Sequence, residues 1–252
     1  HTRPDVWRGS APGFAASAED SDSHPWNISP DFNAVNRNKK SLCLNLYSDE
    51  GKAIFLQLVA KSDILMENFT PRVMGNFGLD YKELRKVNPD IIMVSFSGFG
   101  QLGPYRNYLA NGATIEAMGG WGALCGYING PPQILGAMQA DPICGLQISA
   151  LALVAMVHLD HTGQGQAIDG AMLDAAIGYI GEEIMLADIT GQSSQRIANR
   201  HHDMAPHGVF PCSGEDEWIA IAVRDDYEWQ AVVSLSQPAL TLDDPKFKTL
   251  QD

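Results

Sequence analysis

Positive charge is scarce in this sequence. Its 252 residues include 17 Lys and Arg against 30 Asp and Glu, which gives a formal net charge of −13. Such a chain repels the phosphate backbone of nucleic acids and the surface of anionic membranes. We therefore expect no nucleic-acid partner and no membrane partner, and an anionic ligand would have to be held by local groups.

Cysteine is also scarce. The four cysteines, Cys43, Cys125, Cys144 and Cys212, are scattered, with no C-x-x-C pair and no histidine at metal-ligand spacing. Structural zinc sites and disulfide frameworks need such spacing. The sequence therefore predicts no metal centre, and it favours a reducing compartment, the cytoplasm.

Hydrophobic runs are short. The longest, "ICGLQISALALVAMVH" at residues 143–158, contains Gln147 and Ser149. It falls below the roughly 18 to 20 residues that a bilayer-spanning helix requires, so we predict a buried helix. With 45% hydrophobic residues, the chain can form the core of one large or two smaller domains.

Two catalytic signatures are absent. No G-x-S-x-G nucleophile elbow is present, which excludes a serine hydrolase of that type. "GQGQ" at residues 163–166 has neither a full G-x-G-x-x-G nor a G-K-[ST] ending, so we interpret it as a tight turn between a helix and a strand.

Two clusters of polar side chains resemble sites only superficially. His201, His202 and His207 lie near an aspartate in "NRHHDMAPH", but their spacing fits no recognised metal-ligand pattern. Glu182 and Glu183 are adjacent, and neighbours on a helix point about 100° apart, so they cannot share one catalytic site. We expect a solvated face or a subunit contact there.

The order of the predicted elements indicates an α/β fold. Residues 1–35 lack sustained periodicity and are interpreted as an extended or loop segment. The elements expected next are a strand in "SLCLNL" (41–46), a helix in "SDEGKAIFLQLVAKS" capped by Ser48, a strand in "DILMENF" (63–69), a helix in "DYKELRKVN" (80–88) and a strand in "DIIMVSFSGFG" (90–100). Alternating strands and helices predict a parallel sheet, with ligands bound beyond the carboxyl ends of its strands.

A second, smaller domain is predicted to follow. A helix in "NGATIEAM", the long apolar helix, a strand in "AIDGAM" (167–172) and a helix through Met185 complete a large domain over residues 36–204. "HGVFPCSGEDEWIAIAV" then shows two short alternating strands around a turn, which is typical of the start of an α+β domain over residues 205–252. The boundary is placed within residues 193–206.

Asp141 stands at the start of the long apolar helix. Aspartate is a favoured N-cap, and Pro142 suits the first helical position because no N–H is needed there. A carboxylate at this rigid position could equally do chemistry. The basic run "NRNKK" (36–40) is similarly open: it could hold a phosphate or form a solvated strand entry.

Six blocks of the sequence, taken together and in order, resemble the family III CoA-transferases. The resemblance covers about residues 36–230. The blocks are "NRNKKSLCLNL", "ENFTPRVMGNFGLDY", "VNPDIIMVSFSGFGQLGPY", "GPPQILGAMQADPICG", "HTGQGQAIDGAMLDA" and "NRHHDMAPHGVFPCSGEDEWIAIAV".

The resemblance implies a fold and an assembly. It implies a Rossmann-like large domain followed by a small domain, and an interlocked homodimer in which CoA lies between the large domain of one subunit and the small domain of the other. Family members carry further sequence before "HTRPD" and after the small domain. We therefore expect this chain to be truncated at both ends.

The resemblance also implies site residues. Asp141 matches the nucleophilic aspartate, which would attack an acyl-CoA thioester and carry CoA to an organic acid. CoA or acyl-CoA is then a substrate, and no metal takes part. The further positions carried over are Asn68 and Phe69 as CoA contacts, Lys39 and Arg72 for phosphates or adenine, and His207 in a segment near the acyl group.

Two departures from the family patterns limit the choice of substrate. Asn111 and Gly112 stand where the formyl-CoA and oxalate enzymes have a Tyr-Glu pair, so we expect no specialised oxalate site, and Asn111 is carried over as a candidate substrate or CoA contact. Related acyl-CoA racemases have a catalytic histidine at the position of Asn111. A racemase therefore ranks behind a succinyl-CoA-type transferase, and an inactive acyl-CoA-binding fragment is the non-enzymatic alternative.

Overall fold

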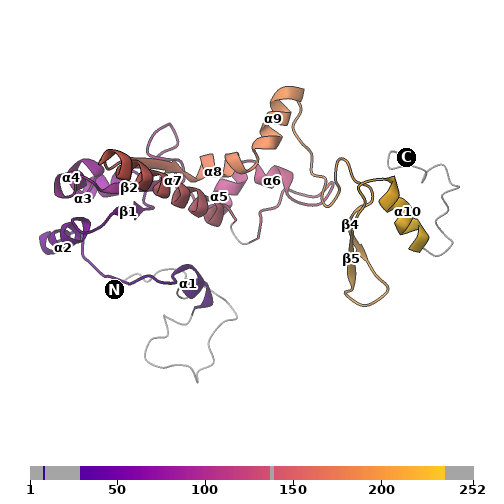
Figure 1. Ribbon diagram of the computed structural model, residues 1–252, viewed down its shortest axis with the longest axis horizontal. Helices are drawn as coiled ribbons and strands as arrows, with labels where there is room; N and C mark the ends of the chain where they lie inside the picture. The colour runs from indigo at the N-terminus through magenta and orange to yellow at the C-terminus, as the bar shows by residue number, and fades with distance from the viewer. Residues whose placement is uncertain (1–7, 9–28, 137–138, 236–252) are drawn as a thin grey trace, which may run out of the picture. The chain divides into compact units, whose positions relative to one another are not determined.

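The computed structural model describes residue 8 and residues 29–136 and 139–235, and it divides into two compact units, His1–Ala53 and Ile54–Asp252 (Figure 1). In the first unit, helix α1 (Pro30–Val35) begins after Ser29, whose hydroxyl accepts a hydrogen bond from the amide of Phe32 at 3.3 Å. The loop predicted to extend to residue 35 is therefore wrong at its end, because Ser29 and Pro30 form a favourable helix start. The predicted boundary near residues 193–206 stays a prediction.

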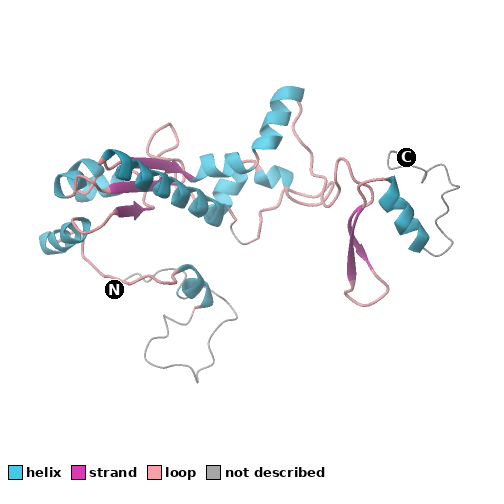
Figure 2. Ribbon diagram, viewed as in Figure 1, coloured by secondary structure: helices cyan, strands magenta, loops and turns pink. Residues whose placement is uncertain are grey.

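A three-stranded parallel sheet is the centre of the second unit. Its strands lie in the order β1, β2, β3, and their bounds are β1 Ile64–Glu67, β2 Ile92–Ser97 and β3 Ala167–Ala171 (Figure 2). Ile64 pairs with Ile92, and Ser97 pairs with Ala171. The three strands and the parallel sheet predicted for this part of the sequence are confirmed.

Helical crossovers connect these strands, as parallel pairing requires. Helices α3 (Arg72–Phe77) and α4 (Tyr81–Val87) lie between β1 and β2, and helices α5 (Gly112–Met118), α6 (Trp121–Leu124) and α7 (Ala140–Thr162) lie between β2 and β3. Helix α2 (Asp49–Val59) precedes β1, and the Ser48 hydroxyl accepts from the amide of Gly51 at 3.1 Å, as its predicted capping role requires.

The strand predicted at residues 41–46 does not form. This stretch has no regular secondary structure, and Leu42 is 62% exposed. Alternating residues make a strand only where a neighbouring strand supplies hydrogen bonds. The sheet ends at β1 within the described residues, so this segment has no such neighbour there.

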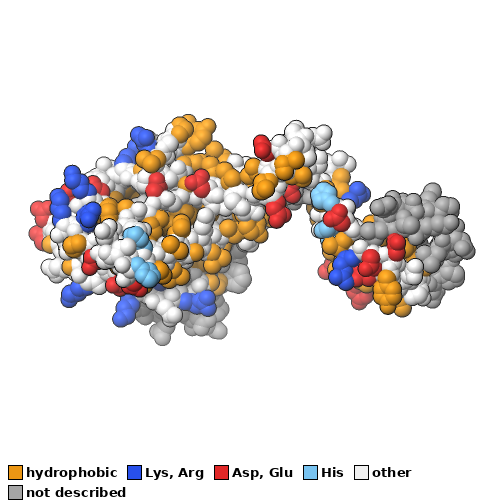
Figure 3. Space-filling model, turned by 45° about the horizontal axis from the view of Figure 1, so that its top comes forward, with side chains coloured by type: hydrophobic (Ala, Val, Ile, Leu, Met, Phe, Trp, Pro, Cys, Tyr) orange, Lys and Arg blue, Asp and Glu red, His pale blue; other side chains and the backbone are white. Residues whose placement is uncertain are grey.

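Helix α7 differs from the predicted buried helix in length and in burial. It has 23 residues, and one stripe packs into the core, formed by Ala140, Cys144, Ile148, Ala152 and Ala155. Its other faces expose apolar side chains, such as Leu153 at 62% and Val154 at 65%, and hydrophobic patches are visible on the face shown in Figure 3. The prediction of a buried helix is confirmed for this stripe and wrong for the other faces, because the described chain supplies packing partners for one face only.

The length argument against a membrane span is also wrong for this helix. By length and composition alone, α7 is apolar enough to cross a membrane, which is weak evidence because core helices of soluble proteins meet the same criteria. Its buried stripe packs against the sheet and against helices α5 and α8 (Met172–Tyr179).

The helix predicted to run through Met185 is two helices. Helix α8 ends at Tyr179, and α9 spans Gly181–Thr190. Between them Ile180 leaves the helical region, with φ −108° and ψ 26°. Gly178 lies two residues before Ile180 and Gly181 directly follows it, and glycine has a low helix propensity, which favours a break here.

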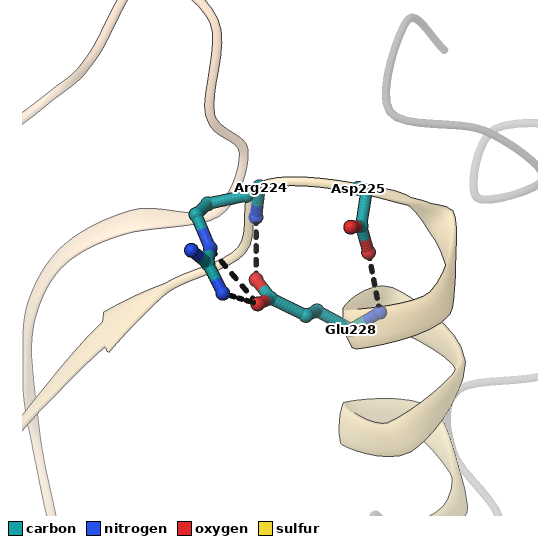
Figure 4. Close-up of polar contacts among 3 residues, drawn as sticks. All are labelled: Arg224, Asp225 and Glu228. Carbon is teal, nitrogen blue, oxygen red and sulfur yellow. Dashed lines mark hydrogen bonds and ion pairs between the residues drawn. The ribbon is translucent and has the colours of Figure 1, made fainter.

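The predicted pair of short strands is confirmed. Strands β4 (His207–Pro211) and β5 (Trp218–Ala222) form an antiparallel hairpin, followed by helix α10 (Asp226–Leu235). Glu228 fixes the start of α10: its carboxylate accepts from the main-chain amide of Arg224 at 2.8 Å and forms an ion pair with the same residue's guanidinium (Figure 4). Asp225 accepts from the Glu228 amide at 2.9 Å.

Candidate active site

A pocket of about 290 Å³ lies where β1 ends and α7 begins. The strand end contributes Met66, Glu67 and Asn68, and one face of α7 contributes Asp141, Gly145 and Ile148. Phe96 of β2 and Met172 at the start of α8 complete the lining. The carboxyl ends of parallel strands are the usual ligand site of such sheets, so this is the position predicted from the sequence.

Asp141 is the second residue of α7, not its N-cap. The helix begins at Ala140, Gln139 occupies the cap position without a side-chain hydrogen bond, and Pro142 still falls within the first turn. The predicted capping role of Asp141 is therefore wrong. Because Asp141 does not cap the helix, its carboxylate is free to face the pocket that it lines.

The surroundings of Asp141 raise the pKa of its carboxyl group above the ordinary value. The largest cause is partial desolvation by the surrounding protein, and the negative charge of Glu116 adds to it. The hydrogen bond from its own main-chain amide opposes both effects. The residue nevertheless remains exposed to solvent.

Glu116 was not predicted from the sequence. This residue of α5 is completely buried, and its carboxylate accepts from the amide of Leu135 at 2.9 Å and from the amide of Ala140 at 3.3 Å. A glutamate inside the apolar pattern "ATIEAM" was the available signal, because buried carboxylates are rare unless they are paired.

Cys144 also lies beneath this site. Its thiol is fully buried and donates to the main-chain carbonyl of Met172, with 3.4 Å between sulfur and oxygen. Burial, with a contribution from the charge of Asp141, raises the pKa of this thiol to about 11. Cys144 is therefore a neutral packing residue at neutral pH and not a nucleophile.

Asn68 is brought to the same pocket as Asp141, although 73 residues separate the two in the sequence. It directly follows β1, and the chain turns there because the amide of Phe69 donates to the Glu67 carboxylate at 2.7 Å. Phe69 is 47% exposed on this turn. Arg72 opens α3 at the end of the same loop and is exposed.

Phe69 and Arg72 do not line the pocket, and three other predicted site residues also lie outside its lining. Asn111 caps α5, where its side-chain oxygen accepts from the amide of Thr114 at 3.0 Å. His207 opens β4, where its ring bonds to the carbonyl of Asn199. Lys39 belongs to the first unit, where its ammonium donates to the carbonyl of Val35 at 2.8 Å.

No group of three or more His, Cys, Asp or Glu side chains that could hold a metal ion occurs within the described residues. Around His207, the ring of His201 lies 5.3 Å away between centroids, and Asp203 donates its amide to the His201 ring. The predicted absence of a metal from the reaction stays a prediction.

Comparison with known proteins identifies the family. The chain is 36% identical to acetyl-CoA:oxalate CoA-transferase of Acetobacter aceti over 86% of its length, and 34% identical to succinyl-CoA–D-citramalate CoA-transferase of Chloroflexus aurantiacus over 85%. These alignments cover 55% and 53% of the relatives, so the chain spans about half their length.

A solved structure gives the same result. A CAIB/BAIF family protein from Brucella suis superimposes with a TM-score of 0.80 at 31% identity, over 87% of this chain and 58% of that one. The family model for CoA-transferase family III matches residues 2–252. The chain therefore belongs to CoA-transferase family III.

Proposed function

We propose that the protein to which this chain belongs transfers CoA from an acyl-CoA donor to a carboxylic acid, with Asp141 as the nucleophile. The observation that carries the proposal is the pocket at the ends of β1 and β2, which Asp141 and Asn68 line together. The transferase names of the relatives described above support the same chemistry.

The proposed reaction begins at the Asp141 carboxylate. One of its oxygens attacks the thioester carbonyl, the C–S bond breaks, and a mixed anhydride and CoA thiolate result. The thiolate then attacks the aspartyl carbonyl, which gives an aspartyl-CoA thioester and releases the donor acid as its carboxylate. The acceptor carboxylate attacks the aspartyl carbonyl of this thioester, the C–S bond breaks, and a second mixed anhydride and CoA thiolate result. The thiolate then attacks the acceptor carbonyl of that anhydride, which gives the new acyl-CoA and releases the Asp141 carboxylate, so no net proton is consumed.

The position of Asp141 suits this role. In the first turn of α7, the main-chain amide of Asp141 donates to its own carboxylate and favours the ionised form, and the positive end of the helix dipole acts in the same direction. Confining the thiolate and the acids in one pocket replaces bimolecular encounters, which is worth on the order of 7–11 kcal/mol. Phe96, Ile148 and Met172 give the pocket an apolar wall that limits hydrolysis of the anhydride.

Further contacts with CoA are proposed from the turn after β1. Asn68 and Phe69 would contact CoA, and Arg72 would meet a phosphate or the adenine ring. In the complete protein, Lys39 would also meet a phosphate or the adenine ring of CoA, and His207 would lie near the acyl group. The cytoplasmic location and the interlocked homodimer also stay predictions.

A transferase is preferred to an acyl-CoA racemase. Racemisation by two bases needs a second proton acceptor beside the carboxylate, and Asn111, which stands where related racemases have a histidine, has a neutral side chain that caps α5. The shape of the pocket determines which donor and acceptor acids the protein uses. A panel of donors and acceptors should include succinate and, because one relative is named for it, oxalate.

Substitution of Asp141 in the full-length protein tests the proposal. Asp141→Ala should abolish CoA transfer from succinyl-CoA but leave CoA binding largely intact, and hydroxylamine should trap the acyl-enzyme on Asp141 in the wild type. Asp174→Ala is a matched control, because Asp174 lies in the first turn of α8 and is exposed. An active Asp141→Ala variant, or trapping at another residue, would contradict the mechanism.

A further inference from the structure

Glu116 is an unusual member of the core. Its side chain has no exposed surface, yet it carries a carboxylate, and it follows the fully buried Ile115 on α5. Leaving such a group unpaired would be costly. Both of its hydrogen bonds come from main-chain amides, those of Leu135 and Ala140.

These two amides bracket the segment that leads into α7. Leu135 lies six residues before Asp141, and Ala140 lies immediately before it. Each oxygen of Glu116 accepts from one of these amides, so a single side chain on α5 holds both ends of the segment that precedes Asp141. Residues 137–138, inside this segment, lie outside the described residues.

Glu116 also supplies the helix start with an acceptor that its own sequence does not provide. The first amides of a helix lack partners within the helix, and a side chain at the N-cap usually satisfies one of them. Gln139 makes no such bond, whereas the distant Glu116 accepts from Ala140. The first turn of α7 is thus fixed by a contact from another helix.

We propose that Glu116 is a positioning residue for Asp141: by holding the amides of Leu135 and Ala140, it aims the Asp141 carboxylate into the pocket. This inference rests on the proposed transferase function of Asp141. This bracing, the pair of hydrogen bonds from the amides of Leu135 and Ala140 to Glu116, is a property of the fold and can be measured without any reaction. Small displacements of a reacting group lower the rate strongly, which is why such a brace matters.

The charge of Glu116 has a second effect. It raises the pKa of Asp141, after the larger contribution from desolvation. Among the described residues, Glu67 of β1 is the other carboxylate in the pocket lining, and the buried Cys144 thiol, with a pKa of about 11, lies three residues further along α7. Removing the charge of Glu116 should therefore lower the pKa of Asp141.

Two substitutions separate position from charge in the full-length protein. Glu116→Gln removes the charge and turns one acceptor into a donor that faces an amide, whereas Glu116→Asp keeps the charge but is one methylene too short to hold both amides. Glu182→Gln is the control, since Glu182 is an exposed carboxylate in the first turn of α9.

Hydrogen exchange measures the bracing directly. In each Glu116 variant at least one of the two amides, that of Leu135 or that of Ala140, should exchange about tenfold faster or more, because the substituted side chain cannot hold both. The control should exchange like the wild type. Unchanged exchange in folded Glu116 variants would overturn the proposal, whatever reaction the protein catalyses.

Kinetics measure the consequence for transfer. Both variants should lose roughly tenfold or more in kcat with little change in KM for the acyl-CoA. The acid limb of the rate profile should move to lower pH in Glu116→Gln and stay near the wild-type position in Glu116→Asp. Wild-type kcat and pH profile in the variants would contradict positioning.

Other outcomes are also decisive. Loss of folding in both variants, measured by circular dichroism, would assign Glu116 a purely structural role and overturn the proposal. If the wild-type protein transfers no CoA, the proposed function fails, and the exchange of the two amides still tests the bracing.

Discussion

Glu116 and Asp141 lie on different helices, yet Glu116 bonds to the residue that directly precedes Asp141. The Glu116 carboxylate accepts from the Ala140 amide at 3.3 Å, and its charge adds to the desolvation that raises the pKa of Asp141. A pair of carboxyl groups near one helix start has consequences for stability as well as for transfer.

Stability should depend on pH through Asp141. A carboxyl group whose pKa is higher in the folded chain than in the unfolded chain destabilises the fold when it is ionised, above its folded pKa. This penalty is removed as the pH falls below the ordinary value of 3.8. Asp141→Asn should therefore raise the free energy of unfolding at pH 7, and the gain should disappear below that value.

Denaturant unfolding at pH 7 and pH 3 measures this effect. Asp174→Asn, in the first turn of α8, controls for loss of a favourable charge at a helix start, and it should not stabilise the protein. A lower stability of Asp141→Asn at pH 7 would show that the carboxylate is favourably placed, contrary to the direction of its pKa.

Asn68 should contribute to acyl-CoA affinity. Asn68→Ala removes one hydrogen-bonding side chain from the pocket that Asp141 lines, and the loss of one bond of about 0.5–1.5 kcal/mol corresponds to a rise in KM of roughly twofold to tenfold. Steady-state kinetics with the full-length protein measure this. Asn76→Ala on the exposed surface of α3 should leave KM unchanged, and an equal KM in both variants would remove Asn68 from the site.

Gly170 should be required for the shape of the pocket. A Cβ atom there would lie 2.7 Å from Phe96 and 2.8 Å from Ile148, and both side chains line the pocket. Gly170→Ala should cost about 1–3 kcal/mol in the free energy of unfolding, because the packed wall must shift, and it should change KM.

Gly178 provides the matched comparison. A Cβ atom at this position of α8 meets nothing within 4 Å, so Gly178→Ala should stabilise the protein by about 0.5–1 kcal/mol through helix propensity. Thermal or denaturant unfolding of both variants measures the contrast. Equal effects of the two substitutions would mean that the close packing around Gly170 is relieved elsewhere.

Cys144 should resist alkylation in the folded protein. The pKa of its thiol is about 11, so little thiolate exists at pH 7, and the side chain is fully buried. Iodoacetamide followed by peptide mass spectrometry should label the exposed Cys43 and Cys212 first and Cys144 only after unfolding. Rapid labelling of Cys144 in the folded protein would show that α7 and α8 separate readily.

Local patterns in the sequence were sufficient for much of the fold. The apolar runs of β1, β2 and β3, the alternation in β4 and β5, and the cap at Ser48 all depend on neighbours within a few residues. The parallel arrangement followed from their alternation with helices, because parallel strands need crossovers. Asp141 and Asn68 were selected through the family resemblance, which local spacing alone did not provide.

Other features depend on partners that are distant in the sequence. The alternation at residues 41–46 was not enough for a strand, because a strand also needs a neighbour. The pattern of α7 did not show which of its faces would be covered, and the break at Ile180 was not foreseen. These outcomes depend on which elements meet in space.

The sequence by itself determined the alternation of strands and helices, the acidic character of the chain and the family to which its motifs point. Only the tertiary structure decided that Asp141 lies beyond the cap of α7, that it shares a pocket with Asn68, and that Glu116 holds the helix start. The physical reason is that the amide of Ala140 has no acceptor in its own turn, and the folded chain supplies one from α5, 24 residues away in the sequence.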